Sequence, residues 1–167
     1  MIKIDRPDCP NQKALDSQNY KHPTNKEALR KANFDKCMYC ESKISHVDFG
    51  DIEHIKPKSK LPELQYNWDN LGYSCSICNN NKKDKYDETC SAINPYHEDP
   101  SHHVIFSGAM LFSKQGSEKG KVTILDIGLN RNGLIEKRLE KTNEIDKTIG
   151  QCNGYSSSQL KKMPLMN

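Results

Sequence analysis

The sequence has few of the residues that build a hydrophobic core. Only 34% of its 167 residues are hydrophobic, 7% are aromatic, and the mean hydropathy is −0.88. A core this lean hardly offsets the conformational entropy that a chain loses on folding. We therefore expect an additional source of stability, such as a bound metal ion whose binding energy is also folding energy.

Long apolar segments are missing as well. No stretch approaches the length needed to span a bilayer. The amino terminus has Asp5 and no apolar run, which is unlike a secretory signal peptide. We predict a cytoplasmic protein that does not contact membranes. The net charge of +3 is too small to indicate nucleic-acid binding by itself.

The cysteines that are present favour metal binding over disulfides in such a protein. Four of the seven form two C-x-x-C pairs, Cys37/Cys40 and Cys75/Cys78, separated by residues 41–74. Two such pairs typically supply the four thiolates of a closed tetrahedral zinc site, which is structural because it has no open position. The alternatives are four reduced thiols in a small core, or an iron–sulfur site.

The residues around these pairs predict two short strands followed by a helix. We expect strands over 51–56 and 71–74, a polar loop between them, and a helix over 76–86. Another short strand is expected over 44–47.

The amino-terminal part predicts little regular structure. Residues 1–25 carry three prolines among polar residues, which is typical of an extended lead-in. A short helix is expected over 26–33, capped by Thr24 or Asn25.

The carboxy-terminal part predicts strands and one long helix. Strands are expected within 104–112, with a turn at Ser107-Gly108, and over 121–125. The helix is expected from 129 to 150. Its apolar stripe should pack on the protein's own core rather than on a partner, and consists of Ile135, Leu139, Thr142, Ile145 and Ile149. The tail over 155–167 is expected to be disordered.

The segment around the cysteine pairs resembles the HNH nuclease motif in its zinc-stapled form. The resemblance rests on DIEHIKP at 51–57, WDNL at 68–71 and CNNNK at 78–82. It implies an α+β fold with a small ββα-metal core. With that resemblance we divide the chain into a lead-in with a short helix (1–36), the HNH nuclease core (37–90) and a carboxy-terminal extension of strands, amphipathic helix and flexible tail (91–167).

The resemblance also implies a catalytic site. His54 would be the general base, since a neutral imidazole has a pKa near working pH. Glu53 and Asn79 would bind a catalytic Mg²⁺ or Mn²⁺, because these ions prefer oxygen ligands. Asp51 is a candidate auxiliary ligand, and Asn70 would hold the loop between the strands. Because Glu53 and His54 face opposite sides of a regular strand, the strand must twist or end there.

Lysines follow both parts of this expected site. Lys56, Lys58 and Lys60 come after the histidine, and Lys82 and Lys83 come after the asparagine. If the fold is of the HNH type, both groups border the metal and can contact a phosphate backbone. Two solvated faces would have the same composition.

A closer resemblance, over most of residues 26–140, is to the HNH nucleases of the Septu and retron-associated anti-phage systems, the PtuB type. It rests on KCMYCE, FGDIEHIKPKSKLPEL, NPYHEDPSHHVIFSGAMLF and TILDIGLNRNGLIEKR. It implies a nuclease that hydrolyses DNA phosphodiester bonds in phage defence beside an ABC/SMC-like ATPase of the PtuA type. The alternatives are an RNA nuclease, acting for instance on tRNA with the same site, and an inactive zinc-knuckle module that binds nucleic acid or a partner.

Overall fold

The computed structural model describes residues 1–44 and 49–153 and has an α+β fold with two small antiparallel sheets. The strand expected over 44–47 and the tail expected over 155–167 fall largely outside these residues. The elements are α1 (Gln12–Asp16), α2 (Pro23–Ala32), β1 (Asp51–His54), η1 (Pro62–Leu64), η2 (Trp68–Asn70), β2 (Leu71–Ser74), α3 (Ser76–Lys82), η3 (Pro100–His102), β3 (Val104–Ser107), β4 (Met110–Ser113), α4 (Glu118–Ile127) and α5 (Asn132–Asn153). Within the described ranges, no helix is both long enough and apolar enough to cross a membrane.

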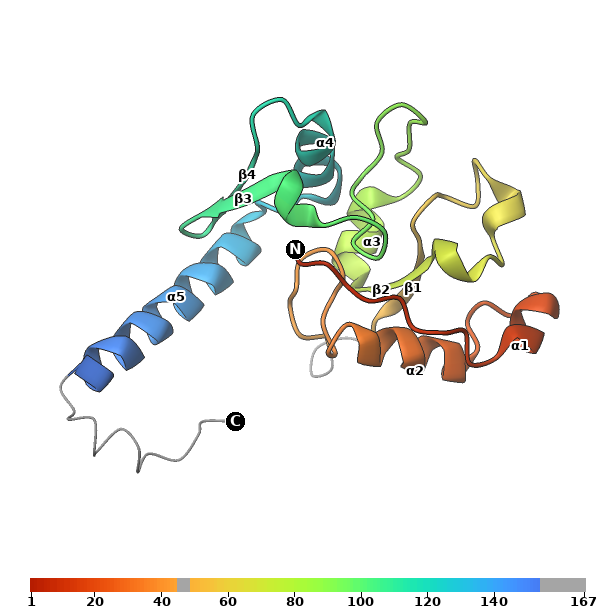
Figure 1. The fold of residues 1–167 in the computed structure, drawn as a ribbon, viewed down its shortest axis with the longest axis horizontal. Coiled ribbons are helices and arrows are strands. Elements are labelled where there is room, and N and C mark those ends of the chain that lie inside the picture. The colour runs from red at the N-terminus through yellow and green to blue at the C-terminus, as the bar shows by residue number, and fades with distance from the viewer. Residues whose placement is uncertain (45–48, 154–167) are drawn as a thin grey trace.

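A two-stranded sheet and the helix after it form the centre of the fold. β1 and β2 are antiparallel, with Asp51 opposite Ser74 and His54 opposite Leu71, and α3 begins two residues after β2 ends. The sheet lies between α2 and α3 (Figure 1). The predicted order of strand, loop, strand and helix is confirmed. β1 ends at His54, earlier than expected, because the backbone of Lys56 bonds to a side chain instead of a strand.

The segment carrying the first cysteine pair packs directly on this sheet. The Met38 backbone N–H donates to the Tyr73 carbonyl at 3.0 Å. A side chain at Gly72 would place its Cβ 2.3 Å from the Met38 sulfur. Glycine at this position of β2 therefore allows the two segments to approach each other. The most deeply buried apolar side chains around them are Leu15, Leu29, Met38, Tyr39, Ile44, Leu71, Tyr73, Ile93, Leu111, Ile127 and Leu129.

The first residues of the chain form no helix or strand, as expected of an extended lead-in, but they are packed against the rest of the molecule. Met1 and Ile4 are buried, and the Arg6 guanidinium donates to the carbonyls of Trp68 (3.0 Å), Asp69 (3.1 Å) and Leu71 (2.6 Å). One arginine thus fastens this segment to the start of β2, an arrangement that local composition does not reveal.

Two short helices follow in the segment that was expected to be irregular. α1 spans Gln12–Asp16, and α2 begins at Pro23, earlier than predicted. The expected caps are wrong, because the His22 side chain accepts the Thr24 backbone N–H at 3.3 Å. Proline fits the first turn of a helix, where its missing N–H is not needed.

The carboxy-terminal extension contains a hairpin and a helix. The hairpin predicted around Ser107-Gly108 is confirmed as β3 and β4. The strand expected over 121–125 is wrong, since these residues lie in α4, which starts at a Ser117 side chain that accepts the Gly120 N–H at 3.1 Å. A short β-branched run does not distinguish a strand from a helix when tertiary packing decides. α4 packs against β4 and α3.

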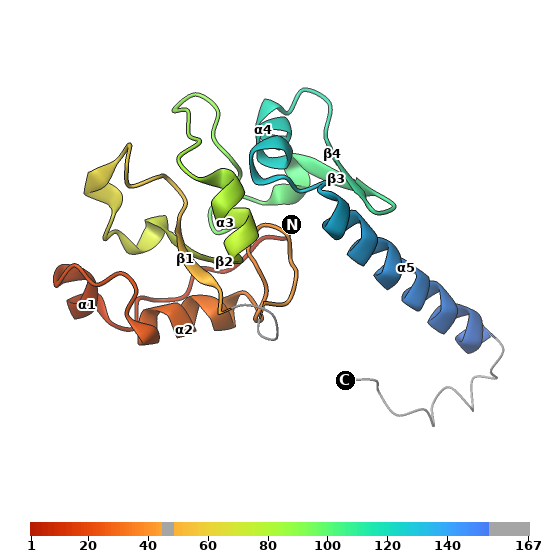
Figure 2. The same ribbon diagram turned by 180° about the vertical axis from the view of Figure 1, so that it is seen from behind.

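α5 extends away from the rest of the molecule in both ribbon views (Figures 1 and 2). Leu134 in its first turn is buried, but Leu139, Ile145 and Ile149 are 49%, 50% and 52% exposed. The prediction that the apolar stripe packs on the protein's own core is therefore wrong beyond the first turns of the helix.

Candidate active site and metal centre

The four cysteines of the two C-x-x-C pairs converge on one point. Their sulfur atoms all lie within 4.8 Å of one another, and the Cys40 and Cys75 sulfurs are 3.9 Å apart. Tetrahedral zinc, with Zn–S bonds of about 2.3 Å, has sulfur–sulfur edges of about 3.8 Å. Cys75 also caps α3, its sulfur accepting the Cys78 N–H at 3.5 Å. The arrangement fits a metal ion held by four thiolates.

A separate cleft lies at β1 and is lined by side chains that the HNH resemblance indicates. Its volume is about 640 Å³. Its lining includes Tyr20, Lys21, Lys26, Asp51, Glu53, His54, Lys58, Asn79, Lys83 and Asp84. Four of the five residues expected to form the catalytic site therefore share one cavity. Glu53 and His54 both line it, although they are neighbours at the end of β1.

The surroundings of His54 orient its imidazole. Nε2 lies 2.9 Å from the Gln65 carbonyl oxygen. Because a carbonyl only accepts hydrogen bonds, Nε2 carries the hydrogen and Nδ1 is the proton acceptor. The ring also meets the Tyr20 ring edge-on, with centroids 4.6 Å apart. Burial lowers the pKa of His54, helped by the charges of Lys58 and Lys82 and opposed by the bond to Gln65. The histidine is thus held neutral, as a general base requires.

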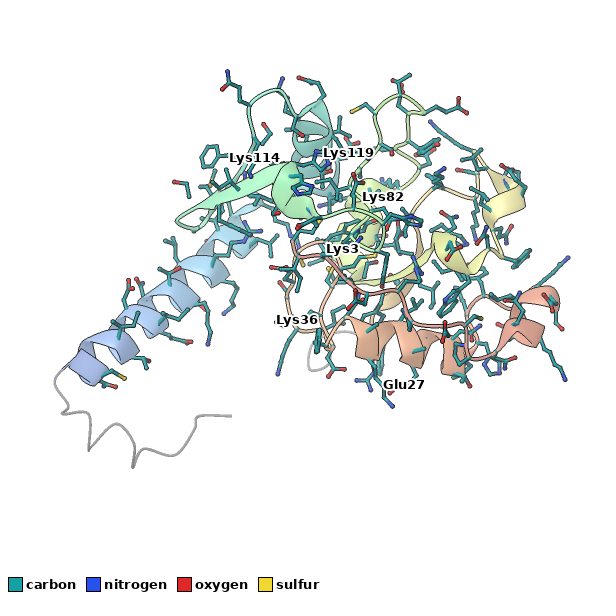
Figure 3. All side chains as sticks on the ribbon, in the orientation of Figure 1. Lys3, Glu27, Lys36, Lys82, Lys114 and Lys119 are labelled. Atoms are coloured by element: carbon teal, nitrogen blue, oxygen red, sulfur yellow. The ribbon has the colours of Figure 1, made fainter. Side chains whose placement is uncertain are left out.

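Glu53 is paired with a buried lysine. Lys82 Nζ lies 2.6 Å from Glu53 Oε1, an ion pair without ideal hydrogen-bond alignment, and it donates to the His54 carbonyl at 2.9 Å. Figure 3 labels Lys82 at the end of α3. Burial raises the pKa of Glu53, and the charge of Lys82 opposes this. The expected contact of Lys82 with nucleic acid is wrong here, because only 1% of the residue is exposed.

Asp51 and Asn79 meet across the cleft from β1 and α3. Asn79 Nδ2 donates to Asp51 Oδ2 at 3.1 Å. Among the described residues, the four cysteines are the one group of three or more His, Cys, Asp or Glu ligand atoms that lie close together. The ligands of a second ion would therefore include the Asn79 amide oxygen and the Glu53 carboxylate. In this structure that carboxylate is turned towards Lys82.

Asn70 lies where the resemblance expects a loop-holding residue. Its Oδ1 accepts the Lys56 N–H at 2.7 Å, and its Nδ2 donates to the carbonyls of Lys56 (2.9 Å) and Leu64 (3.1 Å). The side chain is buried and ties the end of β1 to the loop that carries Gln65, the partner of His54. Its role in orienting His54 stays a prediction.

The structure separates the lysines that the sequence groups together. Lys58 and Lys83 line the cleft, while Lys56 borders a second hollow with Asn70 and Lys60 donates to the Tyr86 carbonyl at 3.2 Å.

The cleft also contains residues that the sequence did not indicate. Tyr20, Lys21 and Lys26 come from the amino-terminal segment, and Lys58 donates to the Tyr20 hydroxyl at 3.1 Å. An aromatic residue next to lysine was the only local signal, and it is too common to be read alone.

Comparison with known proteins agrees with this geometry. Residues 37–85 match the model of the HNH endonuclease family. The chain is 30% identical over 173 aligned positions to Septu protein PtuB of Bacillus mycoides (strain KBAB4), covering 84% of this chain and 59% of that protein. It is 32% identical over 144 positions to Septu protein PtuB of Bacillus thuringiensis, covering 78% and 55%.

The chain thus spans less than two thirds of the length of these two relatives. The family match covers both cysteine pairs and every residue of the cleft that comes from β1 and α3. Residues 37–85 therefore match the HNH endonuclease family, in a chain that is similar to Septu protein PtuB over most of its own length.

Proposed function

We propose that this chain is a metal-dependent HNH endonuclease that hydrolyses DNA phosphodiester bonds. The observation that carries the proposal is the shared cleft, in which Asp51, Glu53, His54 and Asn79 lie together within the segment that matches the family. Roles for single residues follow from their contacts.

His54 is the proposed general base. The Gln65 carbonyl holds the hydrogen on Nε2, so Nδ1 accepts the proton of the attacking water. Tyr20 on one side and the loop fastened by Asn70 on the other restrict the ring to this orientation. A positioned base of this kind contributes about 10²- to 10⁴-fold in rate.

Two different metal ions are proposed. The four cysteines hold a structural zinc. Asp51, Glu53 and Asn79 offer oxygen ligands for a Mg²⁺ or Mn²⁺ ion, and Glu53 must release Lys82 to take part. Such an ion, when bound, stabilises the negative charge that grows on the phosphate and on the departing oxygen.

The nucleic acid is proposed to cross the mouth of the cleft. Lys21, Lys26, Lys58 and Lys83 line it and contribute positive charge from the turn before α2, from α2, from the loop after β1 and from the residue that follows α3. Such contacts position a sugar–phosphate backbone without reading its sequence. DNA and RNA share this backbone charge, so RNA is the other outcome that a cleavage test can return.

Work in phage defence with a PtuA-type, ABC/SMC-like ATPase is proposed from the similarity to the two proteins named Septu protein PtuB.

The decisive experiment is a cleavage assay with a matched histidine control. Purified protein, with and without the ATPase, is incubated with plasmid DNA and total RNA in Mg²⁺ or Mn²⁺. His54→Ala should reduce DNA cleavage by ~10²-fold or more. His102→Ala, which removes an exposed histidine outside the cleft, should leave it unchanged.

Other outcomes are equally informative. RNA cleavage that depends on His54 would replace the DNA assignment. Cleavage that survives His54→Ala would remove the mechanism. If no nucleic acid is cleaved under any condition, the chain is a zinc-knuckle binding module.

A further inference from the structure

An arginine from the carboxy-terminal extension contacts the four-cysteine centre. Arg131 Nη1 lies 3.5 Å from the Cys78 sulfur, and the same nitrogen donates to the Gly128 carbonyl at 3.1 Å. Arg131 lies outside residues 37–85, the segment that matches the HNH family. Neither cysteine pair predicts a partner so far along the chain.

The backbone around Arg131 is fixed against α3. Asn81 of α3 donates to the Ile127 carbonyl at 3.0 Å, and Gly128 ends α4 with a φ of +66°. A Cβ at Gly128 would lie 2.8 Å from Asn81 Nδ2, so the close approach and the left-handed conformation both require glycine. Leu129 is fully buried. These contacts place Arg131 next to the Cys78 sulfur. Cys78 and Asn81 both belong to α3.

A cation at this position would offset the negative charge of the four-thiolate centre. One divalent ion with four thiolates carries a net charge of about −2, and Cys37 and Cys78 are almost completely buried. Buried charge requires hydrogen bonds or a counter-charge. Donors beyond the direct ligands commonly set how firmly such a metal ion is held.

Two other cations near the cysteines are engaged elsewhere. The hollow beside Cys40 and Cys75 is lined by Arg131, Lys137 and the exposed Lys43. Lys137 is exposed and pairs with Glu140 at 2.6 Å. Arg138 donates to the Ala109 carbonyl and lies over the Phe106 ring. Arg131, in contrast, donates to a cysteine sulfur.

We propose that Arg131 is a positioning residue of the metal centre, which donates to the Cys78 sulfur and offsets the charge of the four thiolates. The turn between α4 and α5 then helps to retain the ion, and the carboxy-terminal extension stabilises the HNH core through this residue. The inference rests on the proposed four-cysteine zinc site but not on nuclease activity.

The test compares Arg131→Met with Lys137→Met, a matched loss of a cation from the same hollow. Zinc-loaded full-length protein is mixed with excess chromogenic chelator, and the rate of zinc release is measured. Release should be ~10-fold faster or more in Arg131→Met, in line with the effect of losing an outer partner of a metal ligand. Lys137→Met should release zinc at the wild-type rate, and Arg131→Lys, which keeps the charge, should lie between them.

A second readout separates metal retention from general stability. In cobalt-substituted protein, the sulfur-to-cobalt absorption bands should shift in Arg131→Met and stay unchanged in Lys137→Met. The proposal is overturned if Arg131→Met is folded, keeps the wild-type bands and releases zinc at the wild-type rate.

Two further results also decide the matter. If Arg131→Met does not fold, Arg131→Lys must still release zinc faster than Lys137→Met, and an equal rate overturns the proposal. A wild-type protein that binds no metal at its cysteines overturns it together with the zinc site. Absence of nucleic-acid cleavage leaves the zinc measurements, and this inference, unaffected.

Discussion

Lys82 connects the two residues of β1 that the proposed chemistry needs. Its ammonium group contacts the Glu53 carboxylate and the His54 carbonyl from α3, and both charged side chains are almost fully buried. Such a pair strengthens the fold only while both members are present, because a lone buried charge is costly. Lys82 thus fixes the spacing between helix and strand at the cleft.

Replacement of Lys82 by methionine should destabilise the protein strongly. The Glu53 carboxylate would lose its counter-charge, at a cost of about 3 kcal/mol or more. Urea unfolding measures this against Lys83→Met, which removes the neighbouring cleft lysine and should change stability by less than about 0.5 kcal/mol. The double variant Lys82→Met with Glu53→Gln should recover part of the loss. If Lys82→Met and Lys83→Met are equally stable, the buried ion pair is refuted.

His54 should titrate below the usual histidine range. Burial and nearby lysines lower its pKa, so the folded protein disfavours the protonated ring. As pH falls through the histidine pKa of the unfolded chain, that chain binds a proton that the folded one does not. The contribution of His54 to stability is therefore present above this pKa of about 6.5 and is lost as the pH falls below it.

Nuclear magnetic resonance titration of the imidazole measures the pKa directly. Urea unfolding at several pH values gives the stability, and His54→Gln should remove part of its pH dependence. A titration midpoint above that of the urea-unfolded chain would contradict the expected direction.

At the scale of elements, α5 differs from every other helix described by the structure in how it is packed. Its first turn contributes Leu134 to the core, yet its apolar residues from Leu139 onward are half exposed. Ion pairs along the helix, Lys137–Glu140 and Lys141–Glu144, are exposed and stabilise it only weakly. Most helical stability in proteins comes from tertiary packing of an apolar face, which this part of α5 lacks.

Polar substitutions late in α5 should therefore leave the fold intact. Ile145→Lys together with Ile149→Lys should change the free energy of unfolding by about 0.5 kcal/mol or less, because neither side chain is buried. Leu134→Ala, in the same helix, should cost about 2 kcal/mol or more. Urea unfolding compares the two. A large loss of stability in the double variant Ile145→Lys, Ile149→Lys would mean that α5 packs on the core in solution.

At the scale of the whole molecule, a small apolar core is organised around the four cysteines. The first cysteine pair packs on β2, the second begins α3, and Arg131 reaches it from the turn after α4. A bound ion at this point therefore joins the HNH core to the carboxy-terminal extension. This supports the expectation that the lean hydrophobic composition is offset by metal binding.

Loss of one thiolate should consequently affect the entire fold. Cys75→Ser should abolish stoichiometric zinc binding and lower Tm by about 10 °C or more, since each kcal/mol shifts Tm by about 2–4 °C in a domain of this size. Cys90→Ser, a cysteine outside the cluster, should leave zinc content and Tm unchanged. Zinc analysis and thermal unfolding check both. A zinc-free Cys75→Ser protein with the wild-type Tm would show that the ion is not structural.

Local patterns were sufficient for the HNH core. The two C-x-x-C pairs predicted the cluster, and the residues around His54 and Asn70 predicted two strands and a helix with a short connection. These features depend on neighbours within residues 37–85, and their chemistry limits the structures they can form. In contrast, the apolar run of α4 and the packed amino terminus depend on distant partners such as Ser113 and Trp68.

The sequence by itself determined the cluster of four cysteines and the order of strands and helix, because these follow from spacing along one short segment. The roles of His54, Glu53 and Asn79 come from the family resemblance and stay proposals. Only the tertiary structure decided that Lys82 is buried against Glu53, that Tyr20 and Lys21 line the cleft, and that Arg131 meets Cys78. The physical reason is that the partner of a charged side chain depends on which distant segments pack together. The local sequence around a lysine does not show whether its side chain faces solvent or a buried carboxylate.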